Sequence, residues 1–384
     1  MSNPKKEIRV GLVGYGFMGK THAYAIHNLP FFFENLPFTV KIDGVVTRSM
    51  EKSERIAREL AIPNAYDNED DLLASDVDVI DICTPNICHA ETAKKALAAG
   101  KHLYCEKPLG STLAEAVEMA EAAKASGRIC TAVFNNRHLA AVCRAKELID
   151  EGRLGQILSY QFDYLHNSCV NPEKPAGWKQ ASNICGEGGV LYDLGSHILD
   201  LAVFLCGRIK SVSARSQIAF PTRTGPDGKP WQTDAPEAFY MITKNENGAC
   251  GTLIASKLAT GMNDDIRFLI HGTKGALSFS LMNPNYLGFY DATAQGGNYG
   301  GFSGFTQIEC VGRYPKPAGA FPSPKAATGW LRGHLMSMYH FLNAVYEGKQ
   351  NAPSFADACY IQKVMQAAME AADTCMDVNV ERML

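Results

Sequence analysis

The sequence predicts an α/β domain with a doubly wound parallel sheet, followed by a second, β-rich domain. Up to about residue 135, short apolar strand-like runs alternate with helical segments. A glycine-rich turn comes directly after the first of these runs. After Asn136 the alternation stops, and β-rich runs with turn signals follow one another. These observations place the two domains at 1–135 and 136–384.

The elements of the first domain follow in order along the chain. A crossover at 30–38 is longer than usual, and its three consecutive phenylalanines are expected to pack at a helix end or to form a contact surface. A Ser cap opens the second helix, and Gly100 ends the third. We predict strands at 8–13, 40–47, 77–83, 101–105 and 129–134, and helices at 18–29, 49–60, 88–99 and 112–126.

The second domain starts with a helix at 139–151 and ends with a helix at 354–375, whose apolar residues at helical spacing indicate core packing. The segment 283–327 is rich in Gly, Pro and aromatic residues and has almost no helical period. We interpret it as a lid, or as an arm that lines a substrate site or a neighbouring subunit. Strands are predicted at 157–166, 209–218, 238–243, 250–257, 266–271 and 276–280.

The motif GYGFMG after the first strand has the G-x-G-x-x-G spacing of a dinucleotide-binding turn. Gly14 allows the tight turn, Gly16 lets the backbone approach a pyrophosphate, and Gly19 lets the helix pack closely on the strand. The helix that begins at Phe17 and Met18 offers its first N–H groups to the phosphates. The first domain is therefore predicted to be a Rossmann dinucleotide-binding domain.

The end of the second strand bears on which nicotinamide cofactor binds. An acidic residue there would hold the adenosine ribose and repel a 2′-phosphate, but the chain has Thr47 and Arg48. A hydroxyl and a guanidinium could receive a phosphate, or the guanidinium could stack on adenine. The cofactor is therefore predicted as NAD or NADP, with the choice left open.

The stretch HLYCEKPLGST brings Glu106 and Lys107 to the end of an apolar strand, where Pro108 restricts the backbone. On a surface turn this pair of charges would mean little. At the carboxyl end of a strand in an open α/β sheet, it would lie where ligands bind.

The stretch GGVLYDLGSHILDL places Asp193 and His197 four residues apart in a largely apolar helical segment. This spacing puts a carboxylate and an imidazole on one helix face, one turn from each other. An ordinary surface pair has the same spacing, but the apolar flanks indicate that these polar groups face a pocket.

These motifs together resemble the glucose–fructose oxidoreductase / inositol dehydrogenase / MocA family over nearly the whole chain, through TPNICHAETAKKALAAGKHLYCEKPLGSTLAEA, VFNNRHLAAVCRAKELIDEGRLGQI and GGVLYDLGSHILDLAVFL. The resemblance implies a Rossmann domain followed by an α+β domain with a large open mixed β-sheet. In the family another subunit often covers that sheet, so a homo-oligomer is expected. The segment 283–327 departs from the family pattern.

The resemblance also implies roles for the residues at the ends of the first domain's strands. Lys107 matches the active-site lysine, Glu106 lies near cofactor and lysine, and the proline after the lysine is commonly a cis peptide that would set the lysine's direction. Thr84, Asn86 and His89 match positions that line the nicotinamide ribose side. Helix capping is the alternative for Asn86 and His89.

For the second domain the resemblance implies that Asp193 and His197 are the catalytic aspartate and histidine. Arg137 matches a position close to the substrate. His166 and Trp178 flank the loop before Gly188 and are predicted substrate contacts, because aromatic and hydrogen-bonding groups hold sugar rings. Core packing for Trp178 and a solvated loop for His166 are the alternatives.

Composition excludes several other classes. The 384-residue chain has a net charge of −3 and no basic run, so no nucleic-acid partner is expected. An apolar run of membrane-spanning length and a leader-like start are both missing, which favours a cytoplasmic protein. The twelve cysteines are scattered without zinc-ligand spacing, so reduced thiols are expected and no metal site is predicted.

The predicted function is nicotinamide-dependent oxidation of a secondary ring hydroxyl, such as C3, of a sugar, glycoside or cyclitol. His197 would accept the hydroxyl proton and Lys107 would stabilise the alkoxide, although these two roles are exchangeable. Asp193 would orient the imidazole or bind a neighbouring hydroxyl. The alternatives are a redox-neutral, NAD-dependent glycoside-cleaving enzyme and a dinucleotide-binding sensor without turnover.

Overall fold

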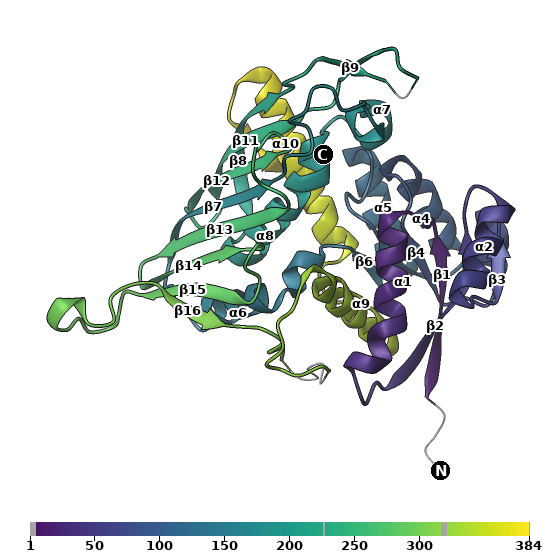
Figure 1. Cartoon of the computed structure of the whole chain (residues 1–384), viewed down its shortest axis with the longest axis horizontal. Coiled ribbons are helices and arrows are strands. Elements are labelled where there is room, and N and C mark those ends of the chain that lie inside the picture. The colour runs from purple at the N-terminus through teal and green to yellow at the C-terminus, as the bar shows by residue number, and fades with distance from the viewer. Residues whose placement is uncertain (1–4, 226, 316–320, 384) are drawn as a thin grey trace. The chain divides into compact units, whose positions relative to one another are not determined.

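The computed structural model describes residues 5–225, 227–315 and 321–383, apart from the side chain of Trp178. The chain forms two compact units (Figure 1). The first contains 1–135, 316–323 and 331–360, and the second contains 136–315, 324–330 and 361–384. Each unit therefore combines segments that are far apart in the sequence. The boundary between 1–135 and 136–384 as folding domains remains a prediction.

The first unit contains a six-stranded sheet in the order β3-β2-β1-β4-β5-β6, with all neighbours parallel. This confirms the doubly wound sheet. The short β3 was not predicted, because its three residues carry no apolar run. The strands are β1 Lys6–Val13, β2 Phe38–Val46, β3 Asn64–Tyr66, β4 Val79–Ile82, β5 His102–Cys105 and β6 Cys130–Ala132.

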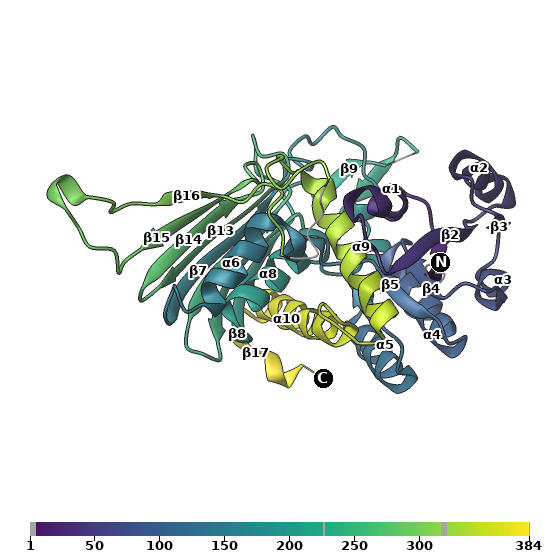
Figure 2. The same ribbon diagram turned by 90° about the horizontal axis from the view of Figure 1, so that it is seen from below.

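Helices cover both faces of this sheet: α1 and α9 lie on one face, and α3, α4 and α5 on the other (Figure 2). The short α3, between β3 and β4, was not predicted either. From Leu331 onward α9 belongs to the first unit. The helices are α1 Phe17–Phe32, α2 Met50–Leu60, α3 Glu69–Ala74, α4 His89–Ala98, α5 Leu113–Ser126 and α9 Trp330–Glu347.

The three phenylalanines at the end of α1 mostly pack, as one of the two sequence interpretations proposed. The helix continues through Pro30 and ends at Phe32 rather than at residue 29. Phe33 stacks on Tyr339 of α9 with ring centroids 4.1 Å apart, and Arg332 lies 4.2 Å from the centroid of the Phe32 ring. Phe31 is 65% exposed.

The second unit is built on a nine-stranded sheet in the order β16-β15-β14-β13-β7-β12-β11-β8-β17. The β7–β12 pair is parallel and the other pairs are antiparallel, which confirms the mixed sheet. A separate hairpin joins β9 Thr222–Thr224 to β10 Pro230–Gln232. The sheet strands are β7 Ile157–Leu165, β8 Ile209–Gln217, β11 Ala238–Asn245, β12 Cys250–Ser256, β13 Asp265–Gly272, β14 Gly275–Ser280, β15 Tyr286–Asp291, β16 Thr306–Glu309 and β17 Val378–Asn379.

Helices of the second unit cover only one face of this sheet, and no helix of the described residues covers the other (Figure 2). Tyr240 and Ile242 lie on the open face and are 42% and 62% exposed. Ile254 and Leu269 are partly exposed there on neighbouring strands. None of the described helices could cross a bilayer. The helices are α6 Ala140–Asp150, α7 Ser182–Cys185, α8 Ser196–Cys206 and α10 Phe355–Thr374, which belongs to this unit from Ile361.

The segment 283–327 is more ordered than its composition predicts, and residues 316–320 of it lie outside the described part. It contributes β15 and β16, which extend the sheet beyond β14. The loop between them forms a projecting arm (Figure 1). This loop carries Tyr299 and Phe302, which are fully and 92% exposed. The two strands, YLGFYD and TQIE, show no regular apolar alternation, so the sequence did not reveal them.

A buried ion pair joins the loops at one end of the mixed sheet. Arg223 on β9 contacts Glu237 at 2.6 Å, and both side chains are 2% exposed. The guanidinium also donates to the carbonyl oxygens of Cys169 and Asn171, and Glu237 accepts from backbone N–H groups of 219 and 220. The pair therefore fixes the loop that follows β7.

We predict that Arg223→Met destabilises the protein by about 3–5 kcal/mol, because it leaves the Glu237 carboxylate buried without its cation. Urea unfolding monitored by circular dichroism measures the change. Lys229→Met, which removes an exposed ion pair from the same hairpin, is the matched control and should cause no measurable loss. Equal stability of the two variants would refute a structural role of the Arg223–Glu237 ion pair.

Candidate active site

The glycine-rich turn after β1 has a separate steric requirement at each glycine. Gly14 has a φ of 89°, and a Cβ there would lie 2.9 Å from the Cys83 carbonyl oxygen. A Cβ at Gly19 would lie 2.5 Å from the Gly14 carbonyl oxygen. At Gly16, by contrast, a Cβ would meet no atom of the described residues within 4 Å. Gly14 and Gly19 thus serve the fold, whereas Gly16 borders open space.

The open space lies at the N-terminus of α1. Gly16 is the N-cap, and Phe17 and Met18 form the first turn, whose N–H groups point out of the N-terminal end of the helix. The positive end of the helix dipole points to the same place. These features fit the pyrophosphate of a dinucleotide.

The loop after β4 offers a second feature that fits a cofactor. The Thr84 hydroxyl oxygen is buried and has no hydrogen-bond partner among the described residues. Its methyl group would lie 3.2 Å from a Cβ at Gly14, so the loops after β1 and β4 are adjacent. A buried hydroxyl in this position favours a ligand contact. Asn86 begins a short 3₁₀ turn, Asn86–Cys88, directly after this loop.

His89, the first residue of α4, is fully buried and bridges two loops. Its Nδ1 lies 3.0 Å from the Pro108 carbonyl oxygen, and its Nε2 lies 3.0 Å from the Thr84 carbonyl oxygen. Burial lowers the pKa of the imidazole, so the ring is neutral and donates to one of the two oxygens at a time. His89 therefore holds together the backbones that follow β4 and β5.

Thr47 and Arg48 differ in their surroundings at the end of β2. The Thr47 hydroxyl contacts the Ser53 hydroxyl at 3.0 Å and the Ser49 carbonyl oxygen at 3.2 Å, so it supports the first turn of α2. Arg48 is exposed. This arrangement suits stacking on adenine as well as binding of a phosphate, so it is compatible with NAD and with NADP.

The segment after β5 presents the charged pair singled out in the sequence. Glu106 is buried, and its Oε2 accepts the backbone N–H of Lys107 at 3.1 Å. Its Oε1 lies 3.2 Å from Nε2 of His22. Burial alone would raise the pKa of the Glu106 carboxyl, but the contact with His22 and the charges of His22 and Lys107 lower it to about 2. The Lys107–Pro108 peptide is cis, as the resemblance implied.

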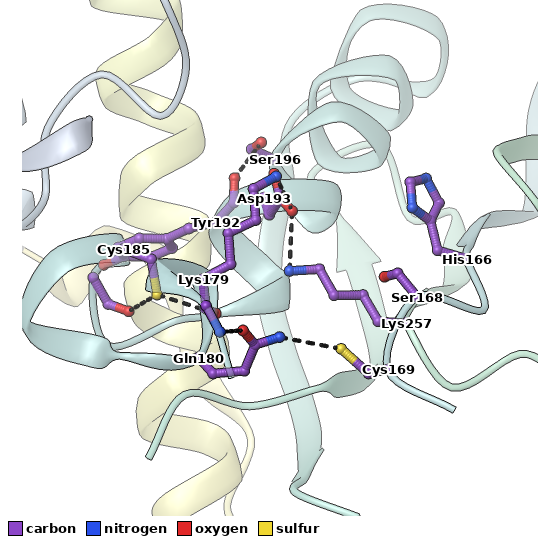
Figure 3. Close-up of polar contacts among 12 residues, drawn as sticks. His166, Ser168, Cys169, Lys179, Gln180, Cys185, Tyr192, Asp193, Ser196 and Lys257 are labelled. Carbon is purple, nitrogen blue, oxygen red and sulfur yellow. Dashed lines mark hydrogen bonds and ion pairs between the residues drawn. The ribbon is translucent and has the colours of Figure 1, made fainter. Parts of the chain in front are cut away.

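In the second unit, two lysines hold the Asp193 carboxylate (Figure 3). The Lys257 ammonium lies 3.0 Å from Oδ2, and the Lys179 ammonium lies 2.9 Å from each carboxylate oxygen. Lys257 is 5% exposed. Burial would lower the pKa of Lys257, but the charge of Asp193 and the hydrogen bond to it raise that pKa, so the buried amine stays charged.

Asp193 lies in a π-helical turn, Leu191–Gly195, that leads into α8 at Ser196. The four-residue spacing to His197 predicted an α-helical turn instead. A π turn is wider than an α turn and shifts the side chains relative to one another around the axis. Single π turns are rare in proteins overall, and many of those that occur lie at functional sites.

His197 contacts a second group of polar side chains. Its Nδ1 lies 3.2 Å from the side-chain nitrogen of Asn136, and its ring centroid lies 5.8 Å from that of Tyr164. The Tyr164 hydroxyl donates to Asp264 at 2.8 Å, and His166 Nε2 lies 2.8 Å from the same oxygen. Burial would raise the pKa of Asp264, but these two contacts lower it. His166 thus belongs to a network that reaches the ring of His197.

Arg137 is buried in a bidentate pair with Asp200 of α8, with Nε 2.8 Å from Oδ2. Its guanidinium also lies 4.8 Å from the centroid of the Phe204 ring. This pairing ties the start of the second unit to α8 and gives the guanidinium a structural role. A substrate contact of Arg137 remains a prediction. The side chain of Trp178 lies outside the described residues.

Several residues of this unit were missed in the sequence, namely Lys257, Lys179, Tyr164, Asp264 and Asn136. Lys257 had a usable signal, because it directly follows the apolar strand CGTLIAS, much as Lys107 comes two residues after its own strand. Lys179 and Asp264 lie in loops without a motif, and only their contacts reveal them.

The predicted site residues therefore divide between the two units. Gly14, Gly16, Phe17, Met18, Thr47, Arg48, Thr84, Asn86, His89, Glu106 and Lys107 belong to the first, and Arg137, His166, Trp178, Asp193 and His197 belong to the second. Within the second unit, contacts through Tyr164 and Asp264 connect His166 to His197.

A Rossmann sheet with a G-x-G-x-x-G turn, together with a large mixed sheet, is an architecture found in nicotinamide-dependent oxidoreductases. The family model described as an oxidoreductase family with an NAD-binding Rossmann fold matches residues 8–134, and the GFO/IDH/MocA C-terminal domain matches 142–278. The chain belongs to the GFO/IDH/MocA oxidoreductase family. Its cofactor is NAD or NADP.

Relatives and solved structures match over nearly the full length. Levoglucosan dehydrogenase of Pseudarthrobacter phenanthrenivorans is 31% identical over 381 residues, which cover 96% of each chain. Glucose-6-phosphate 3-dehydrogenase of Bacillus subtilis is 24% identical and covers 97% of this chain and 98% of its own. A structure of levoglucosan dehydrogenase with NADH and levoglucosan has a TM-score of 0.92 at 31% identity, covering 98% of this chain and 100% of that one.

We predict that Gly16→Thr weakens NADH binding at least about 10-fold without loss of stability. Threonine is an acceptable N-cap, and its side chain would enter the open space at the phosphate position. Fluorescence titration of NADH and a thermal melt measure the two effects. Gly19→Ala is the matched control and should lose stability, because its Cβ would clash with the Gly14 carbonyl. Unchanged NADH affinity in Gly16→Thr would exclude the N-terminus of α1 beside Gly16 as the phosphate-binding position.

Proposed function

We propose that this protein oxidises a secondary ring hydroxyl, such as that at C3, of a sugar, glycoside or cyclitol to a ketone. The observation that carries the proposal is the full-length similarity to two sugar dehydrogenases, one named for oxidation at position 3. Further support comes from a solved relative that holds NADH and levoglucosan together. The aromatic arm between β15 and β16 is consistent with a bulky sugar.

We assign cofactor binding to Gly14, Gly16, Phe17, Met18, Thr47, Arg48, Thr84, Asn86, His89, Glu106 and Lys107. When bound there, the oxidised nicotinamide supplies the acceptor for the hydride of the alcohol. The chain itself has to position the alcohol, remove its hydroxyl proton and stabilise the oxygen that becomes negative.

Lys107 is proposed to stabilise that oxygen. Lys107 comes two residues after β5, at the carboxyl end of the parallel sheet, where open α/β sheets bind ligands. A positive charge placed where negative charge develops lowers the barrier most. The same charge would polarise the ketone in the reverse direction.

His197 is proposed to accept the hydroxyl proton. An imidazole titrates near working pH and can both take and return a proton. The Asn136 amide nitrogen faces Nδ1, and in this orientation the neutral ring carries its hydrogen on Nε2. Proton transfer to Nε2 therefore requires that the amide turn by 180°, so that its oxygen faces Nδ1 and the ring hydrogen moves there.

Asp193 is proposed to bind a hydroxyl next to the reacting carbon. Lys257 and Lys179 hold its carboxylate in one orientation, so its remaining lone pairs can accept from the substrate. Arg137, His166 and Trp178 are proposed as further substrate contacts, His166 through its link to Asp264.

The deciding experiment records absorbance near 340 nm while a panel of sugars, glycosides and cyclitols is added with NAD or with NADP. Reduction of the cofactor by one substrate class supports the proposal and identifies the cofactor. Release of an aglycone without net reduction indicates the redox-neutral glycoside-cleaving enzyme instead. If neither cofactor reduction nor aglycone release is detected, and the dinucleotide still binds, the protein is a sensor without turnover.

We predict that His197→Ala and Lys107→Ala each lower kcat by about 10²–10⁴-fold. The Kd for NADH should change less than about 3-fold in His197→Ala, whereas Lys107→Ala also removes an assigned cofactor contact and should raise that Kd more. Steady-state kinetics and NADH titration measure both quantities. Lys94→Ala, which removes an exposed lysine paired with Glu118, is the control and should keep full activity. Wild-type kcat in either active-site variant would contradict its assigned role.

We also propose that a second copy of the chain covers the open face of the mixed sheet, because Tyr240, Ile242, Ile254 and Leu269 present apolar surface there. Ile242→Glu should lower the molar mass measured by light scattering after size-exclusion chromatography, because a buried carboxylate opposes association. Phe31→Glu, at an exposed position of α1, is the control. An unchanged oligomer in Ile242→Glu would rule out this face.

A further inference from the structure

Glu106 contacts a buried network of charged side chains. Two members of that network, His22 and Asp81, have no role in the proposed reaction. His22 of α1 is 1% exposed, and its Nδ1 lies 2.8 Å from Oδ1 of Asp81, which is fully buried in β4. The Nε2 of the same ring lies 3.2 Å from Oε1 of Glu106. One imidazole therefore lies between two carboxylates.

The network contains a third polar side chain, Cys83, whose Sγ lies 3.1 Å from His22 Nδ1. The group His22, Asp81 and Cys83 has the donor types of a metal site. Two ligands of a tetrahedral zinc ion, each bonded at about 2.0 Å, lie about 3.3 Å apart. The 2.8 Å contact between His22 and Asp81 is a direct hydrogen bond instead. The geometry therefore favours an ionic network over a metal site.

Two carboxylates buried around one ring are stable only if the ring is charged. An ionised carboxylate inside a protein needs a cation and hydrogen bonds. Burial would lower the pKa of His22, but the charge of Asp81 and the hydrogen bond to it raise that pKa well above its usual value. His22 is thus an imidazolium whose Nδ1 donates to Asp81 and whose Nε2 forms an ion pair with Glu106 at 3.2 Å, outside hydrogen-bond geometry.

Other groups facing His22 do not compete for this role. Tyr104 of β5 has its ring centroid 5.1 Å from that of His22, and its hydroxyl donates to Ser337. His334 of α9 has its ring centroid 6.2 Å away, and burial, together with the charge of His22, lowers its pKa to about 3. His334 is therefore neutral, and the positive charges of this region are His22 and Lys107.

We infer that His22 is a positioning residue for Lys107. Its imidazolium, anchored by Asp81, holds Glu106 Oε1, so that Oε2 accepts the backbone N–H of Lys107 and fixes the point from which the lysine side chain leaves. A catalytic role of Lys107, on which this inference rests, requires placement to within a fraction of an ångström. The network thus connects α1, β4 and β5 to the proposed active site.

The first test measures the charge of His22 without using activity. In protein labelled with ¹⁵N at histidine, we expect the His22 ring nitrogens to remain in the imidazolium state between about pH 6 and 8, where an ordinary histidine loses its proton. Asp81→Asn should bring the titration of His22 into this range. A neutral His22 at neutral pH would overturn the inference, whatever the substrate of the enzyme proves to be.

The second test measures function in His22→Gln, which keeps a hydrogen-bonding group but removes the charge. We expect kcat to fall about 10- to 100-fold, with the Kd for NADH and the KM for the sugar within about 3-fold of wild type. Without the charge of His22, the pKa of Glu106 rises. The kcat of the variant should therefore decrease at acid pH, where wild type shows no such decrease.

His102→Gln is the matched control, because His102 lies at the other end of β5 and accepts the Ile129 N–H. It should disturb the strand without changing the pH profile. If both variants lower kcat equally with the wild-type pH profile, His22 is structural only, and the inference fails. If wild type oxidises no sugar, the proposed function fails, while the imidazolium state of His22 is still tested by the ring nitrogens.

Discussion

The close approach of the loops after β1 and β4 is the constraint on which the first unit depends. These two strands pair in parallel. After β1 the chain continues toward the β3 edge of the sheet, and after β4 it continues toward the β6 edge. The carboxyl ends of β1 and β4 are therefore the switch point where open α/β sheets bind ligands. The contact is so close that a Cβ at Gly14 would touch the Cys83 carbonyl. The phosphate-binding turn, the buried Thr84 hydroxyl and the position of α1 all follow from this one pairing.

Buried charges provide a second level of organisation. Arg223 with Glu237, Arg137 with Asp200, and Lys257 with Asp193 each join segments that are distant in the sequence. A buried pair contributes little net stability, but removal of one partner is costly, so such pairs favour one arrangement of the chain. In this protein they occur beside segments that carry proposed site residues.

His22, Asp81 and Glu106 show why such a network matters for chemistry. Glu106 is a proposed cofactor contact, and it is also the link between the buried His22 ring and the Lys107 backbone. A residue in a strand–turn motif can therefore serve the reaction through the backbone of its neighbour. The backbone of Lys107, the proposed catalytic residue, is then held by side chains of α1, β4 and the end of β5.

The sequence by itself determined the parallel sheet and most helix limits, because apolar period, glycine spacing and caps are local properties of the chain. The resemblance of its motifs to a known family implied the mixed sheet and the family. Thr112 at the cap of α5 and Ser49 at the cap of α2 show this directly. Only the tertiary structure decided the partners of the polar groups. Lys257 with Asp193, Asn136 with His197, and His22 with Glu106 are contacts between distant segments, and no local pattern specifies which buried charge will meet which. The same reason hid β15 and β16, because β15 forms by pairing with β14 and β16 by pairing with β15, and neither has a strand pattern of its own.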